Sequence, residues 1–227
     1  MHDYLKPLVM IYRNNRNEKL ALPMAKYMKN KFPFLGIKTP ERKKLFKDFI
    51  AENGYPTQEN LNEIVLQLWE LPEREFQYTA QGILVRFVKK LSLETIDLIE
   101  NLLIRKSWWD TVDLLSSKIV GPHFTRYPQL RESFVTKWMH SKNIWLQRTC
   151  LLFQLNYKDR TDFQLLFSLI KELNGSKEFF INKAIGWILR EYSKTDAESV
   201  IDFVESQKLA PLSRREAYKW LKKNNKI

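Results

Sequence analysis

The segment Lys106–Asp113, KSWWDTVD, lies near the middle of the chain and sets two adjacent tryptophans and two carboxylates inside an apolar run. Helical periodicity continues on both sides of it, and no alternating strand pattern bounded by hairpin turns occurs in the sequence. Only 6 glycines are present, which leaves few tight turns for an all-β protein. The sequence therefore predicts roughly a dozen helices of about 10–18 residues joined by short loops.

Five residues recur at nearly constant spacing early in successive predicted helices. They are Phe76, Trp109, Trp145, Phe180 and Ser213, separated by 33, 36, 35 and 33 residues. A period in the mid-thirties with two helices per unit is typical of an α-solenoid, and the tetratricopeptide consensus is absent. We predict an all-α fold, an α-α superhelix of HEAT-like repeats. Residues 1–227 are expected to form a single domain, with capping helices over about 1–55 and helical repeats over about 56–227.

The chain is strongly basic. Its 38 lysines and arginines exceed its 26 acidic residues, which gives a formal charge of +12 and a pI near 9.6. Such an excess favours a polyanionic partner, and RNA, DNA and an anionic membrane surface all fit it. The aromatic share of 13%, with 7 tryptophans, favours nucleic acid because bases stack on such rings.

Several classes are disfavoured by composition. No apolar run approaches the ~18 residues of a membrane span, and the amino terminus lacks the layout of a secretory signal. One cysteine, Cys150, cannot form an internal disulfide, and its apolar setting favours a buried hydrophobe in a reducing cytoplasm. The scattered histidines and the single cysteine give no metal cluster, and no phosphate loop occurs. We expect no metal and no cofactor.

Within the segment Lys106–Asp113, Trp109 and Asp113 are four residues apart and project from one helical face. An aromatic plane beside a carboxylate can hold a flat cation and stabilise positive charge that develops during a reaction. The alternative is structural, with the tryptophans in the core and the aspartates in ion pairs or helix caps. Trp108 and Asp110 face elsewhere and are assigned to packing and helix support.

Two further stretches carry aromatic and basic side chains. In the first, Trp145 and Arg148 share a face, and Arg148 could clamp a phosphate or pair with Asp113. The second carries Lys183, Trp187 and Arg190 on one helical stripe. An interior glycine in the same helix, at position 186, indicates close approach, either by a ligand or by a neighbouring helix.

The segment 209–216, LAPLSRRE, places Ser213 at a predicted N-cap, with Arg214 and Arg215 just inside the helix. Two arginines are unfavourable at a helix amino terminus, and phosphate binding there would explain them. The alternative is that both arginines are simply solvated. The stacking of repeats is expected to bring Trp109 and Asp113 into one groove with Trp145, Arg148, Lys183, Trp187 and Arg190.

These stretches together resemble the AlkD-type DNA alkylation-repair glycosylases. The resemblance rests on KSWWDTVD at 106–113, NIWLQR at 143–148, AIGWILREY at 184–192 and LAPLSRRE at 209–216, with further likeness in segments 24–30, 34–42 and 71–76. It extends over almost the whole chain. It implies a DNA glycosylase that excises positively charged N-alkylpurines, such as 3-methyladenine and 7-methylguanine, from duplex DNA for base excision repair without flipping the base.

By the same resemblance, Asp113 is the catalytic carboxylate, Trp109 and Trp187 frame the deoxyribose of the lesion, and Arg148 holds a phosphate. Lys183, Arg190, Ser213, Arg214, Arg215 and Trp145 are expected to contact DNA. We expect a monomer with glycosylase activity and no lyase activity. A non-catalytic HEAT-like module that binds nucleic acid or recognises damage is the alternative, and a protein-binding scaffold is a third possibility.

Overall fold

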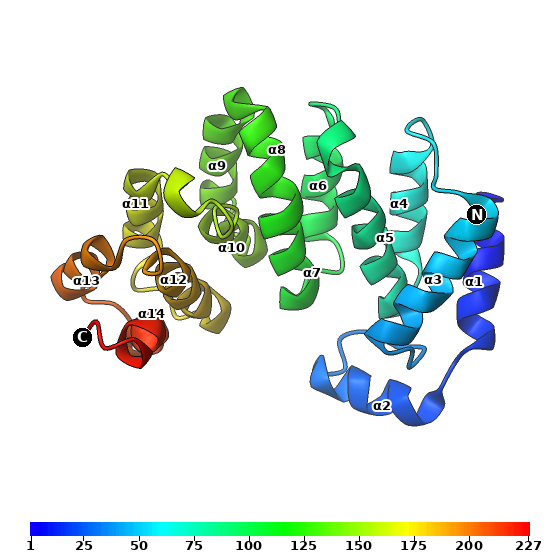
Figure 1. The fold of residues 1–227 in the computed structure, drawn as a ribbon, viewed down its shortest axis with the longest axis horizontal. Coiled ribbons are helices and arrows are strands. Elements are labelled where there is room, and N and C mark those ends of the chain that lie inside the picture. The colour runs from blue at the N-terminus through cyan, green and yellow to red at the C-terminus, as the bar shows by residue number, and fades with distance from the viewer. The chain divides into compact units, whose positions relative to one another are not determined.

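The computed structural model describes residues 1–227, and every regular element in it is helical (Figure 1). The short elements are η1 (Val88–Lys90), the π-helix η2 (Leu115–Val120), η3 (Pro128–Leu130) and η4 (Lys158–Arg160). The α-helices are α1 (Leu5–Asn14), α2 (Glu18–Tyr27), α3 (Thr39–Asn53), α4 (Leu61–Glu70), α5 (Arg74–Phe87), α6 (Thr95–Ile104), α7 (Trp109–Leu114), α8 (Gly121–Arg126), α9 (Arg131–His140), α10 (Ile144–Leu152), α11 (Phe163–Leu173), α12 (Phe179–Tyr192), α13 (Ala197–Ser206) and α14 (Pro211–Lys223). No strand is present, so the predicted all-α class is confirmed.

The predicted recurrence is visible in the helix starts. Helices α5, α7, α10, α12 and α14 begin at Arg74, Trp109, Ile144, Phe179 and Pro211, each 32 to 35 residues after the one before. Each of the five residues used to detect the period lies in the first turn of one of these helices. The fold class is therefore the predicted one, an α-α superhelix of HEAT-like repeats. No helix is long and apolar enough to cross a membrane.

Contacts divide the chain into two compact units, Met1–Phe87 and Val88–Ile227. In the first unit, the fully buried carboxylate of Glu75 accepts hydrogen bonds from the backbone N–H groups of Leu35, Gly36 and Ile37 at 2.9–3.1 Å. Three backbone donors satisfy the buried charge and fix the loop before α3 on α5. The predicted boundary near residue 55, between capping helices and repeats, stays a prediction.

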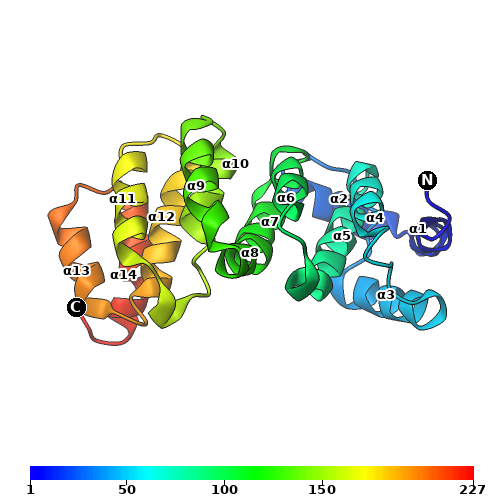
Figure 2. The same cartoon turned by 90° about the horizontal axis from the view of Figure 1, so that it is seen from above.

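In the second unit, α9, α11 and α13 form one row, and α10, α12 and α14 form a second row beside it (Figures 1 and 2). Helix α10 packs against both α7 and α12, and α12 packs against α14 over much of its length. Fully buried aliphatic side chains such as Leu151, Leu166 and Leu189 fill the space between the rows. Every predicted site residue lies on α7, α10, α12 or α14, which we call the site row.

Candidate active site

The centre of the site is an ion pair between the site-row helices α7 and α10. Arg148 donates from Nε to one carboxylate oxygen of Asp113 at 2.7 Å and from a terminal nitrogen to the other at 2.9 Å. The Arg148 side chain is 3% exposed and that of Asp113 is 16% exposed, so only the carboxylate meets solvent to any extent. The geometry is the two-pronged pairing that suits a guanidinium and a carboxylate.

Arg148 also joins this pair to α12, because its remaining terminal nitrogen donates to the backbone carbonyl of Phe180. The start of α10 is fixed by its N-cap, since the side chain of Asn143 accepts from the backbone N–H of Trp145 at 2.9 Å. Of the two readings of Arg148, the structure shows pairing with Asp113. The phosphate contact implied by the resemblance stays a prediction.

Burial raises the pKa of the Asp113 carboxyl above its ordinary value, and the nearby charge of Asp110 raises it further. The hydrogen bonds and the positive charge of Arg148 act in the opposite direction but do not outweigh burial. Asp113 is therefore a more basic carboxylate than an exposed one. A carboxylate with a raised pKa accepts a proton from water more readily at neutral pH.

A second link between α7 and α10 comes from two buried hydroxyls. Ser116, in the π-helix that follows α7, shares its single hydroxyl proton between Thr149 Oγ1 at 2.9 Å and the carbonyl of Val112. Ser117 donates to the carbonyl of Asp113 at 2.7 Å. These bonds lie within a few residues of both members of the ion pair, so they fix the register of the two helices beside it. π-Helical turns often occur at functional sites.

An aromatic cluster of Trp108, Trp145 and Phe180 lies across the same three helices. The ring centroids are 5.5 Å apart for Trp108 and Trp145, and 5.0 Å apart for Phe180 and either tryptophan. The structure therefore places Trp108 in packing contacts, as predicted. Trp145 belongs to the same cluster while keeping part of its surface exposed, and its DNA contact stays a prediction.

Trp109 and Trp187 lie on two different helices of the site row. Trp109 is the first residue of α7, one turn before Asp113, and Trp187 lies in the middle of α12. Both are half-buried, so each keeps ring surface that a ligand could reach. Their predicted role around a deoxyribose stays a prediction.

The carboxyl-terminal part of the site row is organised by Glu216, which sequence reasoning missed. Its carboxylate is 3% exposed and pairs with Lys183 at 2.9 Å, Arg190 at 2.7 Å and Lys219 at 2.5 Å. We call these four residues the Glu216 cluster. Burial alone would raise the pKa of Glu216, but the hydrogen bonds and charges of Lys219 and Lys183 lower it to about 2. The structure thus brings the predicted DNA-binding residues Lys183 and Arg190 together on one anion.

The prediction that Ser213 is the N-cap of its helix was wrong. Helix α14 begins two residues earlier, at Pro211 with Ala210 as the N-cap, because proline is well suited to the first helical turn. The Ser213 side chain is fully buried and donates to the carbonyl of Asn182 at 2.8 Å, so it joins α14 to α12 and cannot reach DNA.

The two arginines after Ser213 differ from each other. Arg214 pairs with Glu205 at 2.9 Å and lies over the Tyr218 ring, while Arg215 is exposed. Glu216 does not close a capping box, since it lies in the cluster described above. The DNA contacts predicted for Arg214 and Arg215 stay predictions.

Gly186 marks the place where α12 and α14 come closest. A Cβ atom at this position would lie 2.5 Å from the Glu216 Cβ and 2.7 Å from the Ser213 carbonyl oxygen. The close approach indicated by this glycine is therefore made by a neighbouring helix. The same glycine was the one signal in the sequence for this contact, since a helix-interior glycine predicts close approach without naming the partner.

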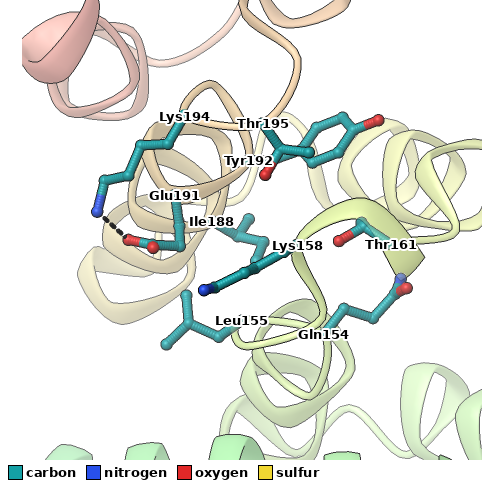
Figure 3. Close-up of a pocket in the computed structure, with 9 residues that line it drawn as sticks. All are labelled: Gln154, Leu155, Lys158, Thr161, Ile188, Glu191, Tyr192, Lys194 and Thr195. Carbon is teal, nitrogen blue, oxygen red and sulfur yellow. Dashed lines mark hydrogen bonds and ion pairs between the residues drawn. The ribbon is translucent and has the colours of Figure 1, made fainter.

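A pocket of about 380 Å³ opens beside the last turn of α12, and Lys194 pairs with Glu191 at its edge at 2.6 Å (Figure 3). It does not include Asp113, Trp109 or Trp187. No group of histidine, cysteine, aspartate and glutamate side chains could hold a metal ion. The lining residues are Gln154, Leu155, Lys158, Thr161, Ile188, Glu191, Tyr192, Lys194 and Thr195.

The protein is thus an all-α protein of paired HEAT-like helices, with a formal charge of +12 and a mostly buried carboxylate one turn from a tryptophan. The family model described as "DNA alkylation repair enzyme" matches residues 12–221, and the chain belongs to that family. A solved structure described as a predicted DNA alkylation repair enzyme from Enterococcus faecalis is 34% identical, with a TM-score of 0.84. The match covers 91% of this chain and 96% of that one. No curated protein matches the sequence.

Proposed function

We propose that the protein is a DNA glycosylase that hydrolyses the N-glycosidic bond of positively charged alkylated purines, such as 3-methyladenine and 7-methylguanine, in duplex DNA. The observation that carries the proposal is Asp113. It is a mostly buried carboxylate with a raised pKa, paired with Arg148 and one turn from Trp109. A groove that only bound phosphates would gain nothing from this carboxylate, because it would repel them.

The chemistry needs little more than this carboxylate and its surroundings. An alkylated purine already carries positive charge, so it leaves without a strong general acid. As the C1′–N9 bond breaks, the base takes the electron pair and departs neutral, and the sugar develops oxocarbenium character. Asp113 stabilises that charge and accepts a proton from the water that adds to C1′. The tryptophan faces support the same positive charge.

Arg148 serves this reaction as a positioning residue. It occupies one lone pair on each oxygen of Asp113 and leaves others for the reacting water, since a carboxylate accepts at about four sites.

No lysine nucleophile is required, so we propose hydrolysis without strand cleavage and without flipping of the base. The enzyme acts as a monomer on duplex DNA. The buried, free Cys150 suits a reducing cytoplasm, where we place the reaction.

The test is release of free 7-methylguanine from methylated duplex DNA by the purified protein, followed by chromatography. Asp113→Asn should bind the duplex about as well as the wild type but lose excision by at least about a hundredfold. Asp110→Asn, three residues earlier on the same helix, is the matched control and should keep most activity. Retained excision in Asp113→Asn would remove the role assigned to this carboxylate.

Two other outcomes bear on the rest of the proposal. Duplex binding with no base release from the wild type would leave a non-catalytic module that binds DNA. A strand nick at the lesion, made by the wild type without heat or alkali, would contradict hydrolysis without lyase activity.

A further inference from the structure

The Glu216 cluster gathers three cations around one buried carboxylate. Glu216 Oε1 accepts from Lys183 and Lys219, and Oε2 accepts from Arg190. A buried carboxylate must be paired to be tolerated, and one cation would suffice for that purpose. The cluster instead carries a net charge of about +2, counted over its four side chains. This surplus of positive charge would stabilise a second anion bound beside Glu216.

The cations are placed to receive that anion from solvent. Their side chains are 36% exposed for Lys183, 27% for Arg190 and 52% for Lys219, whereas Glu216 lies beneath them at 3%. Each ammonium has three N–H donors and the guanidinium has five, and Glu216 accepts only one bond from each side chain. Several charge-assisted donors therefore remain on the exposed side of the cluster.

The contact between α12 and α14 holds the cluster together. Lys183 and Arg190 come from α12, and Glu216 and Lys219 come from α14. Gly186 allows the two helices to meet with no room for a side chain between them, and Ser213 donates to the carbonyl of Asn182 at 2.8 Å. The three cations are thus preorganised by packing before any ligand arrives, which lowers the entropic cost of binding.

We propose that the Glu216 cluster is a phosphate subsite for the DNA backbone, in which Lys219 is a further DNA-contacting residue and Glu216 is the positioning residue that sets all three cations. The proposal rests on duplex DNA as the partner, the substrate of the proposed function. A phosphodiester carries one negative charge on two exposed oxygens and fits a surplus of cationic donors. The chain's formal charge of +12 favours the same polyanion.

The test for Lys219 is the salt dependence of binding to an undamaged duplex, measured by fluorescence anisotropy. Lys219→Gln should make the slope of log K against log salt shallower by about one, the value for one lost phosphate contact. Lys222→Gln is the control because it removes the same charge from an exposed residue three positions further along α14, and its slope should match the wild type. A wild-type slope in Lys219→Gln would overturn the subsite.

The test for Glu216 is a double-mutant cycle on the same undamaged duplex. If Glu216 positions Lys219, then Lys219→Gln should weaken binding far less in a Glu216→Gln background than in the wild type. Purely structural damage from Glu216→Gln would leave the two effects independent, and that result would remove the positioning role. Thermal unfolding of each variant checks that it is folded. Because no damaged base is used, these results are independent of the 7-methylguanine assay.

Discussion

Two carboxylates of the site row, Asp113 and Glu216, are both mostly buried and both paired with cations, yet their pKa values are displaced in opposite directions. Asp113 has one partner, and burial raises its pKa despite that partner. Glu216 has three partners, and the two lysines lower its pKa to about 2 despite burial. Displaced pKa values are common both at reactive groups and in structural ion pairs. The direction in which each pKa is displaced therefore helps to tell the two kinds of carboxylate apart. Asp113 is suited to accept a proton, whereas Glu216 is fixed as a permanent anion that organises cations.

The largest effect is expected from breaking the Asp113 pair. Arg148→Ala leaves a mostly buried carboxylate without its cation, so the free energy of unfolding should fall by about 3–5 kcal/mol. Arg214→Ala is the matched control, since its pair with Glu205 is exposed and its loss should cost at most about 1 kcal/mol. Denaturant unfolding measures both variants. Equal losses would mean that the buried pair contributes no more than a surface pair.

The same variant also sharpens the comparison of the two carboxylates. Without the hydrogen bonds and charge of Arg148, the pKa of Asp113 should rise further, so the acid limb of the excision rate should move to higher pH. The salt slope for duplex binding should stay unchanged, because the Arg148 guanidinium is only 3% exposed and is already paired with Asp113. A slope shallower by about one would instead support the phosphate contact implied by the family resemblance.

A smaller effect is expected at the helix contact beneath the Glu216 cluster. Gly186→Ala forces a Cβ to within 2.5 Å of the Glu216 Cβ, so overpacking should exceed the helix-propensity gain and lower stability by about 1–2 kcal/mol. Gly82→Ala is the control, since a Cβ there has no neighbour within 4 Å and should stabilise α5 by up to about 1 kcal/mol. Thermal unfolding distinguishes the two. Stabilisation by Gly186→Ala would show that α12 and α14 are less tightly joined than the structure shows.

The comparison also shows what the sequence could predict. Trp109, Trp145 and Phe180 recur at helix starts because each repeat needs an apolar anchor at the same place, and this periodicity is local in the chain. The pairing of Asp113 with Arg148 was one of two readings, since a carboxylate and a guanidinium one repeat apart fall on neighbouring helices. The ion pair depends on the burial of both side chains, and burial depends on packing that no single repeat contains.

The Glu216 cluster could not be predicted in the same way. Glu216 follows Ser213 by three residues, which is the spacing of a capping box, so the sequence favoured a local cap over a contact with another helix. The cap does not form because Pro211 starts the helix earlier and Ser213 is turned inward. Glu216 is 26 residues from Arg190 and 33 from Lys183, so nothing local connects them. Only the docking of α14 on α12 brings the charges together.

The smallest effect is expected in the pH dependence of stability, where the two carboxylates should differ in sign. The pKa of Glu216 is lowered from 4.5 to about 2, so its stabilising contribution is fully present above about pH 4.5 and is lost as the pH falls toward about 2. The difference in unfolding free energy between wild type and Glu216→Gln should therefore shrink in acid, by on the order of 1 kcal/mol after solvent screening of the lysines.

The raised pKa of Asp113 has the opposite consequence, since its favourable contribution is present below its ordinary value of 3.8 and is lost as the pH rises through the folded-state value. Wild type should accordingly gain stability relative to Asp113→Asn as the pH falls. Denaturant titrations of the three proteins between about pH 2 and 7 measure both trends. Trends of the same sign would show that the pKa values of the two carboxylates are not displaced in opposite directions.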